Sequence, residues 1–166
     1  VDLPQILYNI PGRTGVNMLP STVARLCGLQ NIVGIKEGSG SVQQASEIVS
    51  TCGDRITVLA GDDALTLPMM AVGGKGVISV TSNIVPSQMA QLVQAFLSSR
   101  IDEARRIHSA LSPLFNALFY ETNPIPVKTA LGLMGKIDPE LRLPLCAMAA
   151  ETKDKLTRVL KDAGLI

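Results

Sequence analysis

The sequence has few aromatic residues and little charge of either sign. Aromatic side chains make up 3% of the 166 residues, tryptophan is missing, and the formal net charge is +1. A surface for nucleic acid or for an anionic membrane would need a concentrated run of lysine and arginine. We therefore expect no nucleic-acid partner and no membrane partner, and the composition favours a small-molecule ligand.

Long hydrophobic runs and paired cysteines are also lacking. The longest uncharged apolar stretches, such as Leu143–Ala150, are shorter than the ~18 residues that span a bilayer, and no stretch has the pattern of a signal peptide. Cys27, Cys52 and Cys146 lie far apart, without the spacing of a zinc or redox motif. We expect three reduced, buried thiols, no metal site and a cytoplasmic location.

Short β-rich apolar runs alternate with helical patterns over the first hundred residues. This alternation is typical of βα units in a parallel sheet. Proline suits the first turn of helices beginning at Pro20 and Pro86, and Ser41 suits an N-cap. We expect strands at residues 5–10, 31–36, 56–61 and 76–80, followed by helices alone at residues 102–120, 126–134 and 143–162. The predicted domains are residues 1–100 and an all-helical domain at residues 101–166.

Four βα units are too few to close a barrel, because an eight-stranded barrel takes about 250 residues. A free half-barrel would leave sheet edges and an apolar inner face uncovered. We therefore predict an α/β fold that is the second half of a (β/α)8 TIM barrel, namely its last four units, followed by a C-terminal helical domain. An open doubly wound sheet is the alternative, but no glycine-rich phosphate fingerprint follows any predicted strand.

Lys36 ends the otherwise apolar run Ile32–Lys36. In a barrel the carboxyl ends of the strands form the face that carries active sites. Burial there disfavours the charged ammonium and supplies a neutral amine that attacks a carbonyl carbon. A Schiff-base role is the functional interpretation, and a lysine that ends a strand and reaches solvent is the alternative.

Tyr8 and Arg13 belong to a second strand end that runs into a Pro-Gly turn. Alternation along the strand places Tyr8 on the face that points to the same mouth as Lys36, where a phenol can relay protons. Arg13 offers a two-pronged donor for a carboxylate. Taken singly, Tyr8 also fits a wall residue and Arg13 a surface salt bridge.

The remaining polar positions give weaker signals. Asp62 and Asp63 lack the partners of a metal site, so helix capping is the expected role. His108 lies in helical register with apolar residues, and we expect it to be structural. Lys128 follows a Pro-rich turn and either lies near the mouth or is solvated.

Six motifs in order resemble the dihydrodipicolinate synthase family, within the superfamily of pyruvate-dependent class I aldolases that includes N-acetylneuraminate lyase. The resemblance covers essentially the whole chain. The motifs are YNIPGRTG from Tyr8, GIKEGSG from Gly34, AGDD from Ala60, GGKGVISV from Gly73, NPIPVKTAL from Asn123 and LRLPL from Leu141.

This resemblance implies condensation of pyruvate with aspartate semialdehyde to 4-hydroxy-tetrahydrodipicolinate in lysine and diaminopimelate biosynthesis, without a cofactor. It implies that Lys36 forms the imine, that Tyr8 relays protons and that Arg13 holds the semialdehyde carboxylate. Gly61 and Ile78 would line the pyruvate pocket through backbone atoms. Family members are usually homotetramers, so we expect a homo-oligomer.

The sequence departs from the family in length, because the family is nearly twice as long and its first four strands have no counterpart here. With them go a pair of threonines that bind the pyruvate carboxylate, a tyrosine lent by a neighbouring subunit and a lysine feedback pocket. A sugar-acid or 4-hydroxy-2-oxoglutarate aldolase is the runner-up, although Arg13 favours the synthase. A catalytically silent assembly piece is the third interpretation.

Overall fold

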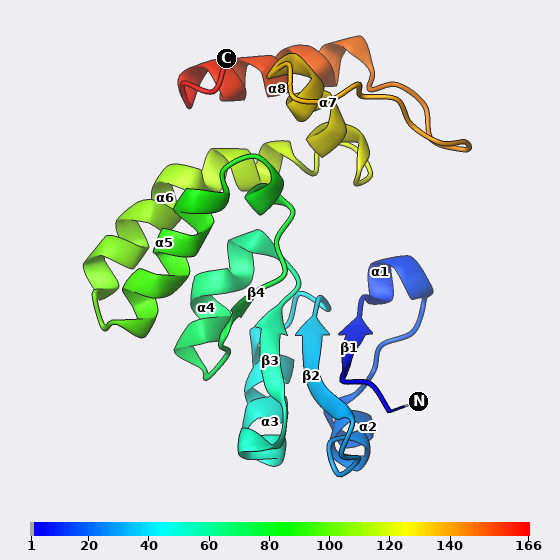
Figure 1. Cartoon of the computed structure of the whole chain (residues 1–166), viewed down its shortest axis with the longest axis vertical. Helices are drawn as coiled ribbons and strands as arrows, with labels where there is room; N and C mark the ends of the chain where they lie inside the picture. Colours follow the sequence, from blue (N-terminus) through cyan, green and yellow to red (C-terminus); the bar gives the residue numbers. More distant parts are fainter. Residues whose placement is uncertain (1) are drawn as a thin grey trace. The chain divides into compact units, whose positions relative to one another are not determined.

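The computed structural model describes residues 2–166. Contacts between backbone segments divide the chain into two compact units, residues 1–79 and residues 80–166 (Figure 1). The sequence pattern places a domain boundary after residue 100, whereas the helix of residues 86–97 packs against the helix of residues 101–117 and so joins the second unit.

The first unit is a parallel sheet with helical connections. Its strands follow the order β1-β2-β3-β4, and every neighbouring pair is parallel. This arrangement confirms the prediction of an α/β fold with parallel βα units. The elements are β1 (Gln5–Asn9), α1 (Pro11–Thr14), α2 (Pro20–Leu26), β2 (Ile32–Glu37), α3 (Val42–Cys52), η1 (Gly53–Arg55), β3 (Thr57–Ala60), η2 (Asp63–Leu65), α4 (Thr66–Ala71) and β4 (Gly76–Val77).

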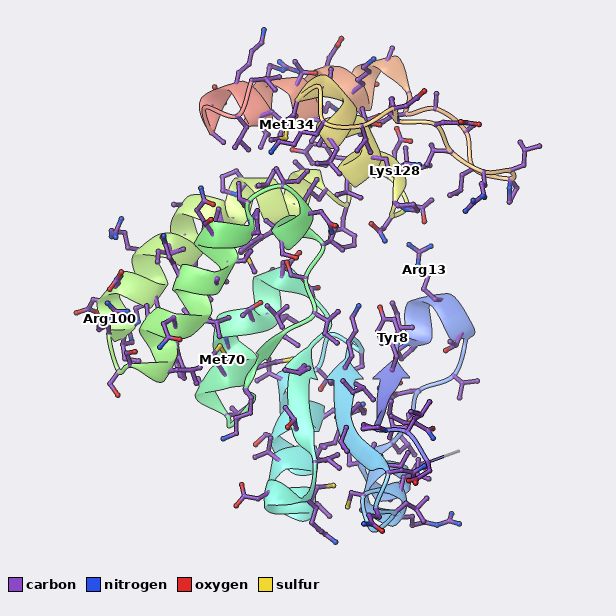
Figure 2. All side chains as sticks on the ribbon, in the orientation of Figure 1. Tyr8, Arg13, Met70, Arg100, Lys128 and Met134 are labelled. Carbon is purple, nitrogen blue, oxygen red and sulfur yellow. The ribbon has the colours of Figure 1, made fainter. Side chains whose placement is uncertain are left out.

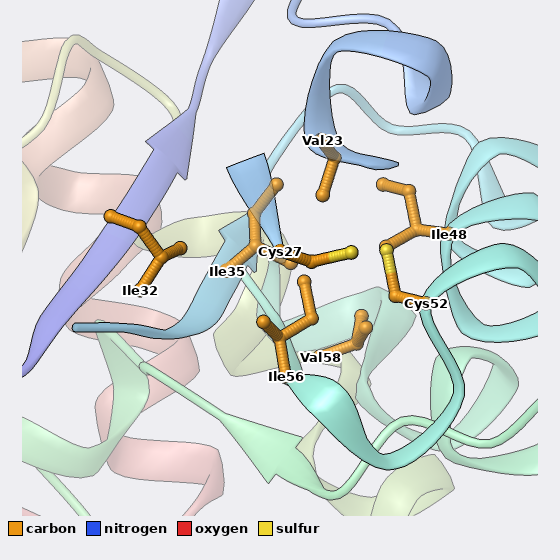
Figure 3. Packing of buried hydrophobic residues seen from close by; sticks show 8 residues of the cluster. All are labelled: Val23, Cys27, Ile32, Ile35, Ile48, Cys52, Ile56 and Val58. Atoms are coloured by element: carbon orange, nitrogen blue, oxygen red, sulfur yellow. The ribbon is translucent and has the colours of Figure 1, made fainter. Parts of the chain in front are cut away.

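One hydrophobic cluster fills the space between the sheet and the helices α2 and α3 (Figure 3). Its buried members are Val23, Cys27, Ile32, Ile35, Ile48, Cys52, Ile56 and Val58. Cys27 and Cys52 face one another in this cluster. Burial, a hydrogen bond with Cys27 and the charge of that neighbour raise the pKa of Cys52 to about 11. The two thiols therefore behave as core residues, as predicted.

The helix ends of this unit follow the local chemistry of the sequence. Ser41 caps α3 by accepting a hydrogen bond from the backbone N–H of Gln44 at 3.0 Å. Gly53 ends the same helix with a positive φ of 56°. Pro20 is the first residue of α2, where its missing N–H costs no helical bond. The starts at Ser41 and Pro20 agree with the prediction from the sequence.

The second unit is built from helices. Its core is formed by apolar residues of α5, α6 and α8, including Leu92, Phe115, Leu156 and Leu160. The elements are η3 (Thr81–Asn83), α5 (Pro86–Leu97), α6 (Ile101–Ala117), α7 (Ile125–Leu133) and α8 (Ala150–Asp162).

Three details of the structure correct the sequence prediction. The helix expected from Leu143 begins at Ala150 instead, and residues 143–149 are irregular. Cys146 lies in this irregular segment and is exposed, so the expectation that all three thiols are buried was wrong. The predicted strand at residues 76–80 is also shorter, because β4 ends at Val77 and a 3-10 turn follows at Thr81.

Among residues 2–166, the helices are too short or too polar to cross a bilayer.

Candidate functional site

Tyr8 and Lys36 are neighbours across the strands β1 and β2. The two residues are paired in the register of the parallel ladder. The Lys36 Nζ lies over the Tyr8 ring, 4.1 Å from its centroid, within the range of a cation–π contact. Tyr8 and Arg13 are labelled at the C-terminal end of β1 in Figure 2. The structure thus brings together the lysine and the tyrosine that the sequence singled out.

Lys36 is less buried than the sequence analysis expected. Its side chain is only partly buried, and Tyr8 is 45% exposed. Ile6 and Ile78 are likewise exposed. Within residues 2–166, Lys36 Nζ has no hydrogen bond or salt bridge, so the ring of Tyr8 is its polar contact. Lys36 is therefore partly accessible to solvent in this chain.

Arg13 lies in the short helix α1 directly after β1. The helix ends at Gly15, whose positive φ of 71° turns the chain back toward the sheet. Thr14 stabilises the turn, because its hydroxyl donates to the Val16 carbonyl at 2.9 Å and accepts from the Val16 N–H at 3.2 Å. Arg13 is exposed at this end of the sheet, where its guanidinium can meet a ligand.

Gly61 and Ile78 follow β3 and β4, at the same end of the sheet as Lys36. The backbone N–H of Gly61 donates to the Glu37 carbonyl at 2.7 Å, and that of Ile78 donates to the Ala60 carbonyl at 3.0 Å. Both N–H groups are therefore already used. Any backbone contact that these two residues make with a ligand would have to be through their carbonyl oxygens.

Glycine at position 38 allows the chain to approach β1 closely. The Gly38 N–H donates to the Asn9 carbonyl at 2.8 Å. A Cβ at Gly38 would lie 2.9 Å from that oxygen and 3.4 Å from Cε2 of the Tyr8 ring. A larger residue here would push the backbone and the Tyr8 ring apart.

A buried polar cluster lies behind the site and was missed by the sequence analysis. Glu37, Asn9 and Gln44 are 0%, 2% and 8% exposed. Glu37 accepts hydrogen bonds from the Asn9 side chain at 3.0 Å and 3.2 Å, from the Gln44 side chain at 3.1 Å and from the Ser39 N–H at 2.7 Å. We call Asn9, Glu37 and Gln44 the amide–carboxylate cluster.

The sequence carried a signal for this cluster. Asn9 and Glu37 each follow a predicted site residue, and alternation places them on the opposite face of their strands, toward the helices. A polar residue on a core-facing position requires a partner, because an unpaired buried polar group is costly. The identity of the partner was hidden, since Asn9 and Glu37 are 28 residues apart.

The weaker sequence signals have local roles in the structure. Asp62 caps η2 by accepting from the Ala64 N–H at 2.9 Å, as expected. Lys128 donates to the Glu140 carbonyl. His108 packs against the Phe115 ring at 5.5 Å, and burial lowers the pKa of its imidazole. Within residues 2–166, no group of three His, Cys, Asp or Glu side chains could hold a metal ion.

These features define an α/β protein whose parallel strand ends present an amine, a phenol and a guanidinium, a set suited to a carbonyl acid. Residues 1–163 match the model of the Dihydrodipicolinate synthetase family. The chain belongs to this family.

Named relatives agree with this assignment. The chain is 60% identical over 166 residues to 4-hydroxy-tetrahydrodipicolinate synthase of Geobacter metallireducens, and 58% identical over 164 residues to that of Thermodesulfovibrio yellowstonii. The match covers 100% of this chain and 57% of the Geobacter protein, and 99% and 56% for the Thermodesulfovibrio pair. The chain thus spans little more than half the length of these relatives.

Solved structures show the same fold. Dihydrodipicolinate synthase of Thermotoga maritima superposes with a TM-score of 0.97 at 46% identity, over 100% of this chain and 58% of the other. The Aquifex aeolicus enzyme gives a TM-score of 0.97 at 48% identity, over 99% and 57%. The fold described above is therefore that of part of a dihydrodipicolinate synthase.

Proposed function

We propose that this chain carries the imine-forming half of a 4-hydroxy-tetrahydrodipicolinate synthase, which condenses pyruvate with aspartate semialdehyde. The observation that carries the proposal is the pairing of Lys36 with Tyr8, with Nζ 4.1 Å from the ring centroid. Family membership supports it. The products of this chemistry would serve lysine and diaminopimelate biosynthesis.

The proposed reaction begins with attack of the neutral Lys36 amine on the ketone carbon of pyruvate. Loss of water gives an iminium that acidifies the methyl group, and loss of a methyl proton gives an enamine that attacks the aldehyde. The amine of the second substrate then closes the ring and releases Lys36. Tyr8 would carry protons to and from these intermediates. This route uses covalent catalysis by the lysine and requires no cofactor or metal.

The other predicted residues have roles in substrate binding. Arg13 would pair with the carboxylate of aspartate semialdehyde, for which its planar fork is suited. Gly61 and Ile78 would face pyruvate with their carbonyl oxygens, since their N–H groups are used within the sheet.

We further propose that the four βα units are half of a closed eight-stranded barrel and that its last four units are the ones present. The run of helices from Pro86 onward supports this order, because a barrel repeat would return to a strand after each helix. The helices at residues 101–166 would then be the C-terminal helical domain. The other four strands would cover the exposed face that holds Ile6, Tyr8 and Ile78.

The complete protein is proposed to be a homo-oligomer located in the cytoplasm, as the family resemblance implies. The helix α8 is amphipathic, and its apolar residues Leu156 and Leu160 are buried within the chain. This apolar face therefore packs inside one subunit and is not available for contact between subunits. Any contact between subunits would therefore involve other surfaces.

A sugar-acid or 4-hydroxy-2-oxoglutarate aldolase is the second candidate. Such an enzyme would share Lys36 and Tyr8, but Arg13 favours a partner aldehyde with a carboxylate of its own. Turnover of aspartate semialdehyde compared with sugar acids separates the two.

Borohydride reduction in the presence of pyruvate tests the proposed function. We expect a pyruvyl adduct on Lys36 in a peptide map of the 166-residue chain. Lys36→Ala should abolish the adduct, and Lys128→Ala should leave it unchanged. The absence of an adduct in a folded chain would contradict an imine site that functions in this chain by itself. Co-expression with the four missing βα units of a relative would then show whether they are required.

A further inference from the structure

Glu37 is a buried carboxylate that is held by neutral donors. It is 0% exposed, and its hydrogen-bond partners within residues 2–166 are two side-chain amides and one backbone N–H. Glu37 takes part in none of the salt bridges within residues 2–166. A buried charge without a cation is retained only where its hydrogen bonds are complete, so the surrounding donors must be well fixed.

The backbone of Met18 fixes the orientation of both amides. The Met18 N–H donates to Asn9 Oδ1 at 2.9 Å, which turns the Asn9 NH2 group toward Glu37. The Met18 carbonyl accepts from Gln44 Nε2 at 3.3 Å, which turns the Gln44 NH2 group the same way. With the Ser39 N–H, three donors converge on position 37. An acceptor-only carboxylate fits them, whereas an amide would place a donor against a donor.

The amide–carboxylate cluster joins every segment that carries a candidate site residue before β3. Asn9 follows Tyr8 in β1, and Glu37 follows Lys36 in β2. Met18 directly follows residues 10–17, the segment that contains Arg13. Asn17 adds a second tie, because its Nδ2 donates to Gln44 Oε1 at 2.9 Å. One end of the Arg13 segment is thus attached through Asn9 to the strand that carries Lys36, and the other end is attached to Gln44 in α3, which itself donates to Glu37.

We propose that Glu37 is a positioning residue that holds Lys36, Tyr8 and the Arg13 segment as one rigid group. The cluster lies on the helix-facing side of the strands, so Glu37 does not touch the substrate. Its effect is on orientation, and misplacement of reacting groups slows reactions strongly. The inference rests on the proposed function for its catalytic meaning, while the attachment itself can be tested without any activity.

Hydrogen exchange followed by peptide mass spectrometry tests the attachment in the 166-residue chain. Glu37→Gln should speed exchange in the peptides spanning residues 9–18 and 37–41 by about tenfold or more, because it leaves a buried donor unpaired. The control is Ile56→Val, which removes one methylene from the core cluster at the other end of the sheet. In this control, exchange in the peptides of residues 9–18 and 37–41 should not increase more than exchange in the rest of the first unit.

Two results would overturn the proposal. One is unchanged exchange at residues 9–18 and 37–41 in Glu37→Gln. The other is an equal change in Ile56→Val, since general destabilisation would then explain the effect.

A kinetic measurement separates positioning from stability. In borohydride trapping at varied pyruvate, Glu37→Gln should lower the maximal rate of adduct formation by about tenfold or more and leave the half-saturating pyruvate concentration unchanged. Gly61 and Ile78, which would contact pyruvate, have no bond to the Glu37 side chain, because Gly61 donates to the Glu37 backbone carbonyl. A change in half-saturation alone would contradict a positioning role. If the parent chain forms no adduct, the proposed function fails for this chain, and the exchange experiment still decides whether Glu37 holds the three segments.

Discussion

The two units of the chain differ in the reach of their side-chain hydrogen bonds. In the first unit, the Asn9 and Glu37 pair spans 28 positions and the Asn17 and Gln44 pair spans 27. In the second unit, Gln94, Thr129 and Thr157 each bond to a residue four positions away. Glu121 and Lys128 are exceptions, since Glu121 accepts from the Ala149 N–H at 3.0 Å across 28 positions and Lys128 donates to the Glu140 carbonyl across 12 positions.

This difference shows where each unit is sensitive to change. A local bond stabilises its own helical turn, and the turn survives if the bond is lost. A buried bond between distant strands sets the separation of those strands, and its loss leaves a donor or acceptor unpaired. The first unit should therefore tolerate fewer changes near its strand ends than the second unit tolerates in its helices.

The largest expected effect is that of adding one methyl group to Gly38 in the first unit, compared with the same change at Gly132 in the second unit. A Cβ at Gly38 would lie 2.9 Å from the Asn9 carbonyl oxygen, and a Cβ at Gly132 would lie 2.9 Å from Cγ of the Pro139 ring. Gly38→Ala should lower the free energy of unfolding by about 1–3 kcal/mol, because the opposing atom belongs to a backbone held in the sheet. Urea denaturation followed by circular dichroism measures the change.

Gly132→Ala serves as the matched comparison. The Pro139 side chain lies in an irregular segment that can shift, and alanine is favoured over glycine by about 1 kcal/mol within a helix such as α7. We expect a smaller loss than for Gly38→Ala, or none. Equal losses in the two variants would contradict the contrast between the units.

An effect of intermediate size is expected for the pH dependence of the unfolding free energy, and it arises from His108 in the second unit. Burial lowers the pKa of His108 below its ordinary value of 6.5, so the unfolded chain binds a proton more readily than the folded chain. Protonation therefore favours unfolding, and stability should fall as the pH drops below about 6.5 toward the lower folded pKa. His108→Leu should make the unfolding free energy less dependent on pH between about 5 and 7.

The chain contains one histidine, so no second imidazole contributes to the difference between the parent and His108→Leu. Denaturant titrations at several pH values give the slope for both proteins. A slope that is identical in the parent and in His108→Leu would show that His108 does not titrate differently in the two states.

The smallest effect is a difference in thiol reactivity that leaves stability unchanged. Cys146 is exposed in the second unit, whereas Cys27 and Cys52 are buried in the first. Because the thiolate is the reactive form, the raised pKa of Cys52, about 11, further slows its modification. A maleimide should label Cys146 alone in the folded chain and all three thiols in denaturant. Mass spectrometry of the labelled peptides checks this, and rapid labelling of Cys52 in the folded chain would contradict its burial.

Local chemistry explains which parts of the fold could be predicted from the sequence. The cap at Ser41, the helix starts at Pro20 and Pro86, and the strand around Ile35 depend on residues within a few positions of one another. The helix start near Leu143 failed because an apolar pattern alone does not distinguish a helix from an irregular segment with a buried side chain such as Met148.

The site was predicted unevenly for the same reason. Tyr8 and Lys36 were placed together because the carboxyl ends of parallel strands meet at one edge. The roles of Asn9, Glu37 and Gln44 depend on hydrogen bonds across 28 and 7 positions, and on the backbone of Met18. No short-range pattern in the sequence encodes such contacts.

The open edge of the sheet has a practical consequence for anyone who purifies this chain. Within residues 2–166, β1 pairs with β2 on one side and with no strand on the other, and Leu3 and Ile6 beside that edge are 64% and 51% exposed. Unpaired backbone groups next to apolar side chains recruit further strands and promote aggregation. Solubility should therefore depend on protein concentration, and dilute, cold stocks or a fused solubility partner will preserve the folded chain longest.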